Sequence, residues 1–156
     1  MTHSLYLYCL LAFLIFITMQ DVRCRKMKNN SLLSLLIFQL VCTLALMNPC
    51  ILSASIVLTL GMVIYSYNVI GAGDIKYAAV LSLSLPVELL LNAVLLTMLT
   101  GGVLATFYML LNLARRIKAN VYGEIDQSQY NTGIPYGVAI SVGFYVMIFS
   151  HWVNYI

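Results

Sequence analysis

Six apolar runs, separated by short polar segments, account for most of the chain. The runs cover about residues 4–20, 32–47, 51–70, 75–88, 89–113 and 134–153. A helix of roughly 20 apolar residues is long enough to cross the hydrocarbon core of a bilayer. The pattern therefore predicts an all-α, polytopic membrane protein with about six transmembrane helices. Because no long polar segment divides the runs, we expect a single integral-membrane domain over residues 1–156.

The composition excludes a large water-soluble domain. Hydrophobic residues make up 62% of the chain and charged residues 8%, whereas soluble domains carry about 25% charged residues. The net charge is +3, and the basic residues are grouped in short loops instead of being spread over a surface. We therefore expect contacts with membrane lipids and no binding of nucleic acid.

The basic residues predict which loops face the cytoplasm, because Lys and Arg are enriched in cytoplasmic loops. They occur after the first run, beside the fourth and after the fifth: Arg23, Arg25, Lys26 and Lys28; Lys76; Arg115, Arg116 and Lys118. These three loops are predicted to be cytoplasmic, which puts both ends of the chain on the opposite side. There, Trp152 and Tyr155 are expected to anchor the last helix at the membrane interface.

Two aspartates mark the cytoplasmic ends of predicted helices. Asp21 closes the first run, and Asp74 opens the fourth, with apolar sequence on both sides of it. A charged group at membrane depth is costly and is therefore usually functional. If antiparallel packing brings the two carboxyls together, they share one proton. The ionised carboxylate can then activate water while the protonated one donates a proton, which predicts an aspartic protease.

Three motifs, taken in order, resemble those of a known protease family. Asp21 is followed by a basic segment through Lys28, and Gly71-Ala72-Gly73-Asp74-Ile75-Lys76 matches the signature Gly-x-Gly-Asp-x-Lys. A Gly-Ile-Pro-Tyr-Gly segment, residues 133–137, opens the last run. Together they resemble the small prepilin peptidases of the Tad/Flp pilus type, which are Gly-x-Gly-Asp intramembrane aspartic proteases. The chain departs from them at residues 27–29, which read Met-Lys-Asn where the family usually has Ile-Pro-Asn.

The resemblance implies that Asp21 and Asp74 are the catalytic pair. It also implies a set of residues that shape the site: Gly71, Gly73, Lys76, Gly133, Pro135 and Gly137. The implied reaction removes the leader peptide of type IV prepilins or pseudopilins at the cytoplasmic face of the bacterial inner membrane. Cleavage would follow a glycine that precedes the hydrophobic segment of the substrate. The expected partners are these prepilins, membrane lipids and the pilus or secretion machinery.

We expect neither a metal nor another cofactor. The four cysteines include no Cys-x-x-Cys pair, and the two histidines lie at opposite ends of the chain. A zinc site needs ligands at much closer spacing. Larger members of the family that the chain resembles carry paired Cys-x-x-Cys motifs and an N-methyltransferase activity, so we expect a peptidase without that activity.

Alternatives remain open at this point. The acids could serve a small proton-coupled transporter subunit or a non-catalytic membrane assembly factor, or Asp21 could only cap its helix or pair with Arg25. Lys76 could neutralise Asp74, bind an acidic group or a phospholipid head, or act as a snorkelling anchor. The segment 133–137 could pair with an extended substrate, or simply begin a helix with proline in its first turn.

Overall fold

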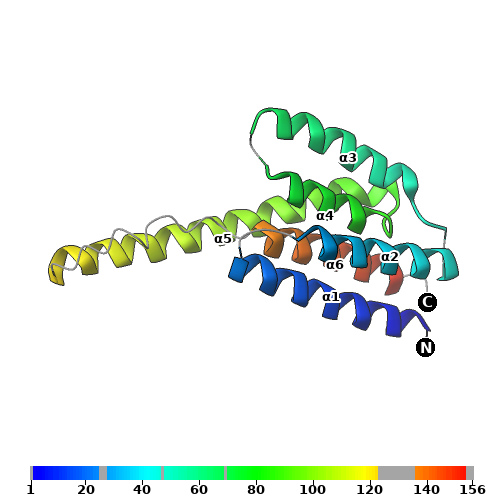
Figure 1. Cartoon of the computed structure of the whole chain (residues 1–156), viewed down its shortest axis with the longest axis horizontal. Helices are drawn as coiled ribbons and strands as arrows, with labels where there is room; N and C mark the ends of the chain where they lie inside the picture. The colour runs from blue at the N-terminus through cyan, green and yellow to red at the C-terminus, as the bar shows by residue number, and fades with distance from the viewer. Residues whose placement is uncertain (1, 25–27, 47, 69, 123–135, 154–156) are drawn as a thin grey trace.

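The computed structural model describes residues 2–24, 28–46, 48–68, 70–122 and 136–153. Within these ranges every regular element is a helix, and the helices are α1 (Thr2–Cys24), α2 (Asn29–Leu46), α3 (Ile51–Ser66), α4 (Ala72–Ser82), α5 (Val87–Tyr122) and α6 (Tyr136–Val153). Helices α1, α2, α4 and α6 lie alongside one another, α3 lies over one side of them, and α5 extends beyond the rest (Figure 1). The prediction of an all-helical chain is confirmed.

Four of the helices are long and apolar enough to cross a membrane. The candidate spans are His3–Arg23, Asn29–Leu46, Val87–Ala114 and Tyr136–Val153. Helix α3 has 16 residues and α4 has 11, so α4 is only about 17 Å long at 1.5 Å per residue. The hydrocarbon core is roughly 30 Å thick. Helix α4 is therefore too short to span it, and the protein itself must satisfy the backbone groups at its ends.

The ends of α3 and α4 come earlier than the apolar runs predict, and local chemistry explains both. Pro86 has no N–H and disfavours a helical conformation at the residue before it, so α4 ends at Ser82 and not at residue 88. Just after the end of α4, the Leu83 carbonyl accepts the N–H of Cys50 at 2.9 Å. Helix α3 ends at Ser66 because Asn68 has a φ of 56°, a left-handed conformation that ends helices.

Helices α1 and α5 instead continue past the ends of their apolar runs. The first run stops before Asp21, yet α1 continues to Cys24; the fifth stops at residue 113, yet α5 continues to Tyr122. An apolar run marks which residues avoid water, whereas helical hydrogen bonding continues through polar residues that tolerate it. Asp21 is therefore held inside a helix, on a defined face, instead of in a loop.

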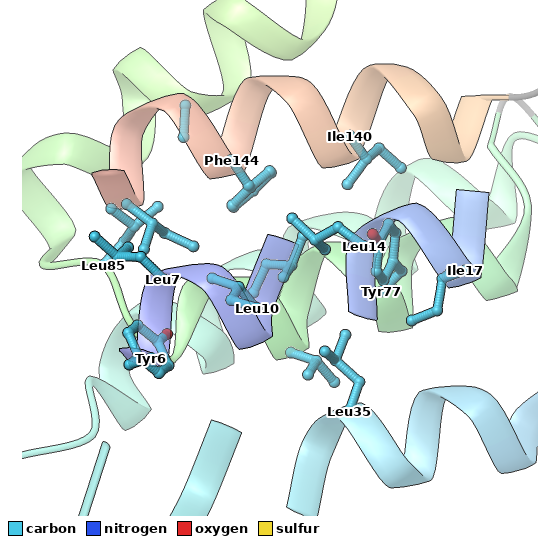
Figure 2. Close-up of a cluster of buried hydrophobic side chains, with 14 of the residues drawn as sticks. Tyr6, Leu7, Leu10, Leu14, Ile17, Leu35, Tyr77, Leu85, Ile140 and Phe144 are labelled. Atoms are coloured by element: carbon cyan, nitrogen blue, oxygen red, sulfur yellow. The ribbon is translucent and has the colours of Figure 1, made fainter. Parts of the chain in front are cut away.

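One buried face of α1 has an apolar middle with a polar group at each end. Leu10, Leu14 and Ile17 lie between Tyr6 and Asp21, and all five are at most 8% exposed. They follow one another at steps of three or four residues, which puts them on a single face of the helix. Side chains from α2, α4 and α6 surround this face (Figure 2). The helical bundle thus has a buried polar side chain of α1 near each end and an apolar core between them.

Trp152 belongs to this core, so the expectation that it anchors the chain at the interface is wrong. Its side chain is fully buried. Its ring centroid lies 4.5 Å from that of Tyr6 and 5.2 Å from that of His3. The reason is that the end of α6 packs against the beginning of α1, which covers the indole. Tyr155 lies outside the described residues.

Candidate active site

Asp21 is buried in the last turns of α1 and binds the beginning of α6. Its side chain is 8% exposed, and its Oδ2 accepts the backbone N–H of Gly137 at 3.0 Å. Gly137 is the second residue of α6, where backbone N–H groups have no partner within the helix. The positive end of the helix dipole also favours a negative charge there. This hydrogen bond therefore fixes the Asp21 carboxyl at the beginning of α6.

Asp74 lies in the first turn of α4 and folds back onto Gly71. The N–H of Asp74 donates to the Gly71 carbonyl at 3.1 Å, and the Asp74 carboxylate accepts a backbone hydrogen bond from Gly71. A Cβ at position 71 would lie 3.2 Å from Oδ2 of Asp74, which is tighter than an ordinary contact. Gly71 thus leaves room for the carboxylate to reach back to the backbone.

The two aspartates come from helices distant along the chain and interact electrostatically. Asp74 is outside the four candidate spans and is only half-buried. Burial, followed by the charge of Asp21, raises the pKa of Asp74 to about 6, although the hydrogen bond from Gly71 acts in the opposite direction. A carboxyl with such a pKa holds its proton near neutral pH far more often than an isolated aspartate does.

Tyr77 and Ser141 connect α4, which carries Asp74, to α6, which carries Gly137. The sequence predicted a role for neither residue. Ser141 Oγ donates its only proton to the Gly137 carbonyl at 2.7 Å. The Tyr77 hydroxyl, 2.7 Å from the same Oγ, must therefore be the donor in that contact. Tyr77 also interacts electrostatically with Asp21. The spacing in the sequence could have indicated both residues. Tyr77 follows Asp74 by three positions and Ser141 follows Gly137 by four, so each shares a helix face with a residue predicted for the site.

Of the remaining residues that the sequence predicted for the site, Lys76 is separated from Asp74 by the fold. Lys76 is exposed and lines a groove formed by α2, α3 and α4, and in the described part of the chain Asp74 makes no ion pair with it. Two positions on a helix point in nearly opposite directions, which explains the separation. Gly73 lies beside Asp74 in the first turn of α4. Gly133 and Pro135 lie outside the described residues.

Two cavities meet at Asp74. One, of about 440 Å³, is lined by residues of α5 and α6 that include Gly101, Gly102 and Ala139. The other, of about 250 Å³, has an almost wholly apolar wall that includes Phe144. Asp74 thus faces space large enough for side chains of another molecule. Among the described residues, no group of three or more His, Cys, Asp or Glu side chains could hold a metal ion.

The sequence model of the type IV leader peptidase family matches residues 8–106, more than half of the chain. The match includes both Asp21 and Asp74. The chain belongs to the type IV leader peptidase family. As a type IV leader peptidase it is a protease, and its long apolar helices make it a membrane protein. The comparisons with curated proteins and with solved structures gave no match.

Proposed function

We propose that this type IV leader peptidase is an aspartic endopeptidase whose catalytic residues are Asp21 and Asp74. The observation that carries the proposal is their electrostatic coupling: the charge of Asp21 contributes to the raised pKa of Asp74, about 6. A coupled pair of acids in one site is what acid–base hydrolysis of a peptide requires. The pair as a whole holds the proton, so its titration belongs to both residues.

In the proposed mechanism Asp21 is the base and Asp74 carries the shared proton. The Gly137 N–H holds the Asp21 carboxyl in place, and burial favours the protonated form of Asp74. Water attacks the scissile carbonyl carbon, Asp21 accepts the water proton, and the Asp74 proton passes to the carbonyl oxygen. The carbon–nitrogen bond of this tetrahedral intermediate then breaks. Asp21 returns its proton to the leaving amine, and the hydroxyl that becomes the new carboxyl oxygen returns a proton to Asp74.

The proposed substrates are prepilins or pseudopilins, cleaved at the cytoplasmic face of the bacterial inner membrane by a single membrane domain. The family and the basic segments support this assignment, since Arg23 and Lys28 flank the Asp21 end of the bundle and Lys and Arg are enriched in cytoplasmic loops. Cutting a leader where it meets a hydrophobic segment requires the acids at that boundary. The proposal is supported by the position of Asp21 near the end of α1 and of Asp74 in the first turn of α4.

A proton-coupled transporter is less well supported by the same residues. Such a protein needs polar groups along its path through the membrane. On the buried face of α1, Leu10, Leu14 and Ile17 separate Asp21 from the next polar side chain, Tyr6. This apolar stretch favours chemistry at one end of the bundle over transport through it.

The test is leader cleavage by the purified full chain, measured as two fragments on a gel with a prepilin as substrate. We expect Asp21→Asn and Asp74→Asn each to lower the cleavage rate by about 10²–10⁴-fold, the usual contribution of general acid–base catalysis. Each variant should still insert into membranes at the wild-type level, because asparagine keeps the size of the side chain.

Glu88→Gln is the matched control. It makes the same acid-to-amide change at an exposed position in the first turn of α5 and should leave the rate within about twofold. Cleavage by either aspartate variant at a rate close to that of Glu88→Gln would refute the assignment of the catalytic pair.

A further inference from the structure

A groove of about 670 Å³ lies between α2, α3 and α4, apart from the two cavities at Asp74. Asp74 faces the cavities next to α5 and α6, whereas Lys76 lines this groove. The two residues are on opposite sides of α4 because they are separated by two positions. The groove is therefore a feature separate from the candidate active site, and leader cleavage does not account for it.

The groove has one polar end. Asn29 and Asn30 begin α2, and Lys76 lies near the beginning of α4; all three are exposed. Their amide and ammonium groups are hydrogen-bond donors, and the ammonium group also carries a positive charge. The described residues offer Lys76 no carboxylate within ion-pair distance. This end of the groove is therefore complementary to an anion.

The rest of the groove is apolar. Leu36, Leu58 and Leu83 are among the side chains that line it. Two hydroxyls also lie on its wall, but Ser55 Oγ donates to the Ile51 carbonyl at 2.8 Å and Thr59 Oγ1 to the Ser55 carbonyl at 2.8 Å. Their protons are used within α3, so neither offers a donor to a ligand. A molecule that fills the groove needs an anionic head and an apolar chain.

We propose that this groove binds one anionic phospholipid. Its phosphate lies against Lys76, Asn29 and Asn30, and an acyl chain follows the leucines between α2 and α3. The charge complementarity favours a lipid over the hydrophobic helix of a protein substrate, which would leave Lys76 without a partner. Bound in this way, the lipid fills the space that separates α3 from α2.

The experiment measures which lipid the full chain retains. The protein is reconstituted with equal amounts of phosphatidylglycerol and phosphatidylcholine, extracted in mild detergent, and analysed by native mass spectrometry. We expect one retained lipid, with phosphatidylglycerol preferred about fivefold, the factor that one basic residue contributes to binding of anionic lipid. Lys76→Gln should remove the preference, whereas Arg23→Gln, which removes an exposed cation of α1 outside the groove, should keep it.

A second pair of variants tests the apolar part. Ala54→Trp puts an indole into the groove and should lower retention of both lipids, whereas Leu52→Trp, at an exposed position of α3 that does not line the groove, should not. Equal retention of the two lipids by the wild type, or equal losses in Lys76→Gln and Arg23→Gln, would overturn the proposal. So would a photo-crosslinker at Leu58 that captures a prepilin helix and no lipid. None of these readouts depends on cleavage, so they are independent of the proposed catalytic pair.

Discussion

Two buried polar networks lie at different levels of the same helical bundle. The Tyr6 network consists of Tyr6, Gln39 and Ser84, whose side-chain oxygens lie 2.7 to 2.8 Å apart. The Asp21 network consists of Asp21, Asp74, Tyr77, Gly137 and Ser141. Fifteen positions along α1 separate Tyr6 from Asp21, which corresponds to about 22 Å at 1.5 Å per residue. The Tyr6 network ties α1 to α2 and to the segment that follows α4, whereas the Asp21 network ties α1 to α6 and α6 to α4.

The difference between them lies in charge. The Tyr6 network contains only hydroxyls and an amide, so its protons stay in place near neutral pH. The Asp21 network contains two coupled carboxyls, one with a pKa raised to about 6. Interhelical hydrogen bonds of the first kind stabilise one packing arrangement, whereas the second can also move a proton. Buried polarity alone therefore does not identify an active site, and a coupled acid pair is the better indication.

The largest expected difference between the networks is in catalysis. The double variant Asp21→Asn/Asp74→Asn should lose no more cleavage activity than either single variant, about 10²–10⁴-fold, because the two acids act as one unit. Tyr6→Phe should change the rate per folded molecule by less than about threefold, since Tyr6 is far from the acids. Steady-state cleavage rates, normalised to folded protein, provide the comparison. Losses that multiply in the double variant would mean that the acids act independently.

Much of this arrangement could be predicted from the sequence. The six helices follow from the six apolar runs, because a chain in a bilayer must satisfy its backbone hydrogen bonds internally, as a helix does. A position of Asp21 and Asp74 on the same membrane side could be expected from topology: two apolar runs, 32–47 and 51–70, lie between them, two crossings return the chain to the side it left, and Arg23 and Lys76 are expected to mark that side. Their separation in sequence was therefore no obstacle to the prediction.

The polar partners could not be predicted in the same way. Tyr77 and Ser141 lie in apolar runs, where hydroxyl residues are common and often bond to their own helix. Which of them face each other depends on how each helix is rotated, and a single sequence does not determine that rotation. Trp152 shows the same limit, because an indole near a helix end suits either an interface or a core. The groove beside Lys76 likewise depends on where α3 lies.

The second prediction is that the pH dependence of cleavage comes from the Asp21 network and not from the Tyr6 network. If Asp74 must carry the shared proton, cleavage by the wild type should fall as pH rises through about 6, by about tenfold per pH unit above it. The sign follows from the raised pKa: the active, protonated form of Asp74 is present below it and is lost above it. A Tyr6→Phe variant should keep this profile. The measurement is kcat/KM between pH 5 and 8, and a profile flat over that range would contradict the role given to Asp74.

The third prediction concerns stability, to which we expect the Tyr6 network to contribute although it has little effect on catalysis. Tyr6→Phe removes the hydroxyl that contacts both Gln39 and Ser84 and should lower the free energy of unfolding by about 1–2 kcal/mol, given the usual strength of interhelical hydrogen bonds in membranes. Tyr8→Phe is the control, because Tyr8 is 71% exposed and should cost less than about 0.5 kcal/mol. Unfolding in detergent monitored by circular dichroism measures both. Equal losses in the two variants would show that the Tyr6 network does not stabilise the bundle.

The smallest expected effect is that of Gly71→Ala, which tests whether the backbone hydrogen bond from Gly71 controls the proton on Asp74. Gly71 has φ −70° and ψ 141°, an extended conformation open to any residue, so Gly71→Ala should not strain the backbone. Its Cβ would, however, lie 3.2 Å from Oδ2 of Asp74 and push the carboxylate away from the backbone hydrogen bond that lowers the pKa of Asp74. The alkaline limb of the pH profile should therefore move to higher pH, by roughly half a unit. Gly102→Ala, whose Cβ would meet nothing within 4 Å, should keep the wild-type midpoint. A limb that stays in place, or moves to lower pH, would mean that this hydrogen bond does not control the proton on Asp74, and the glycine would then need another explanation.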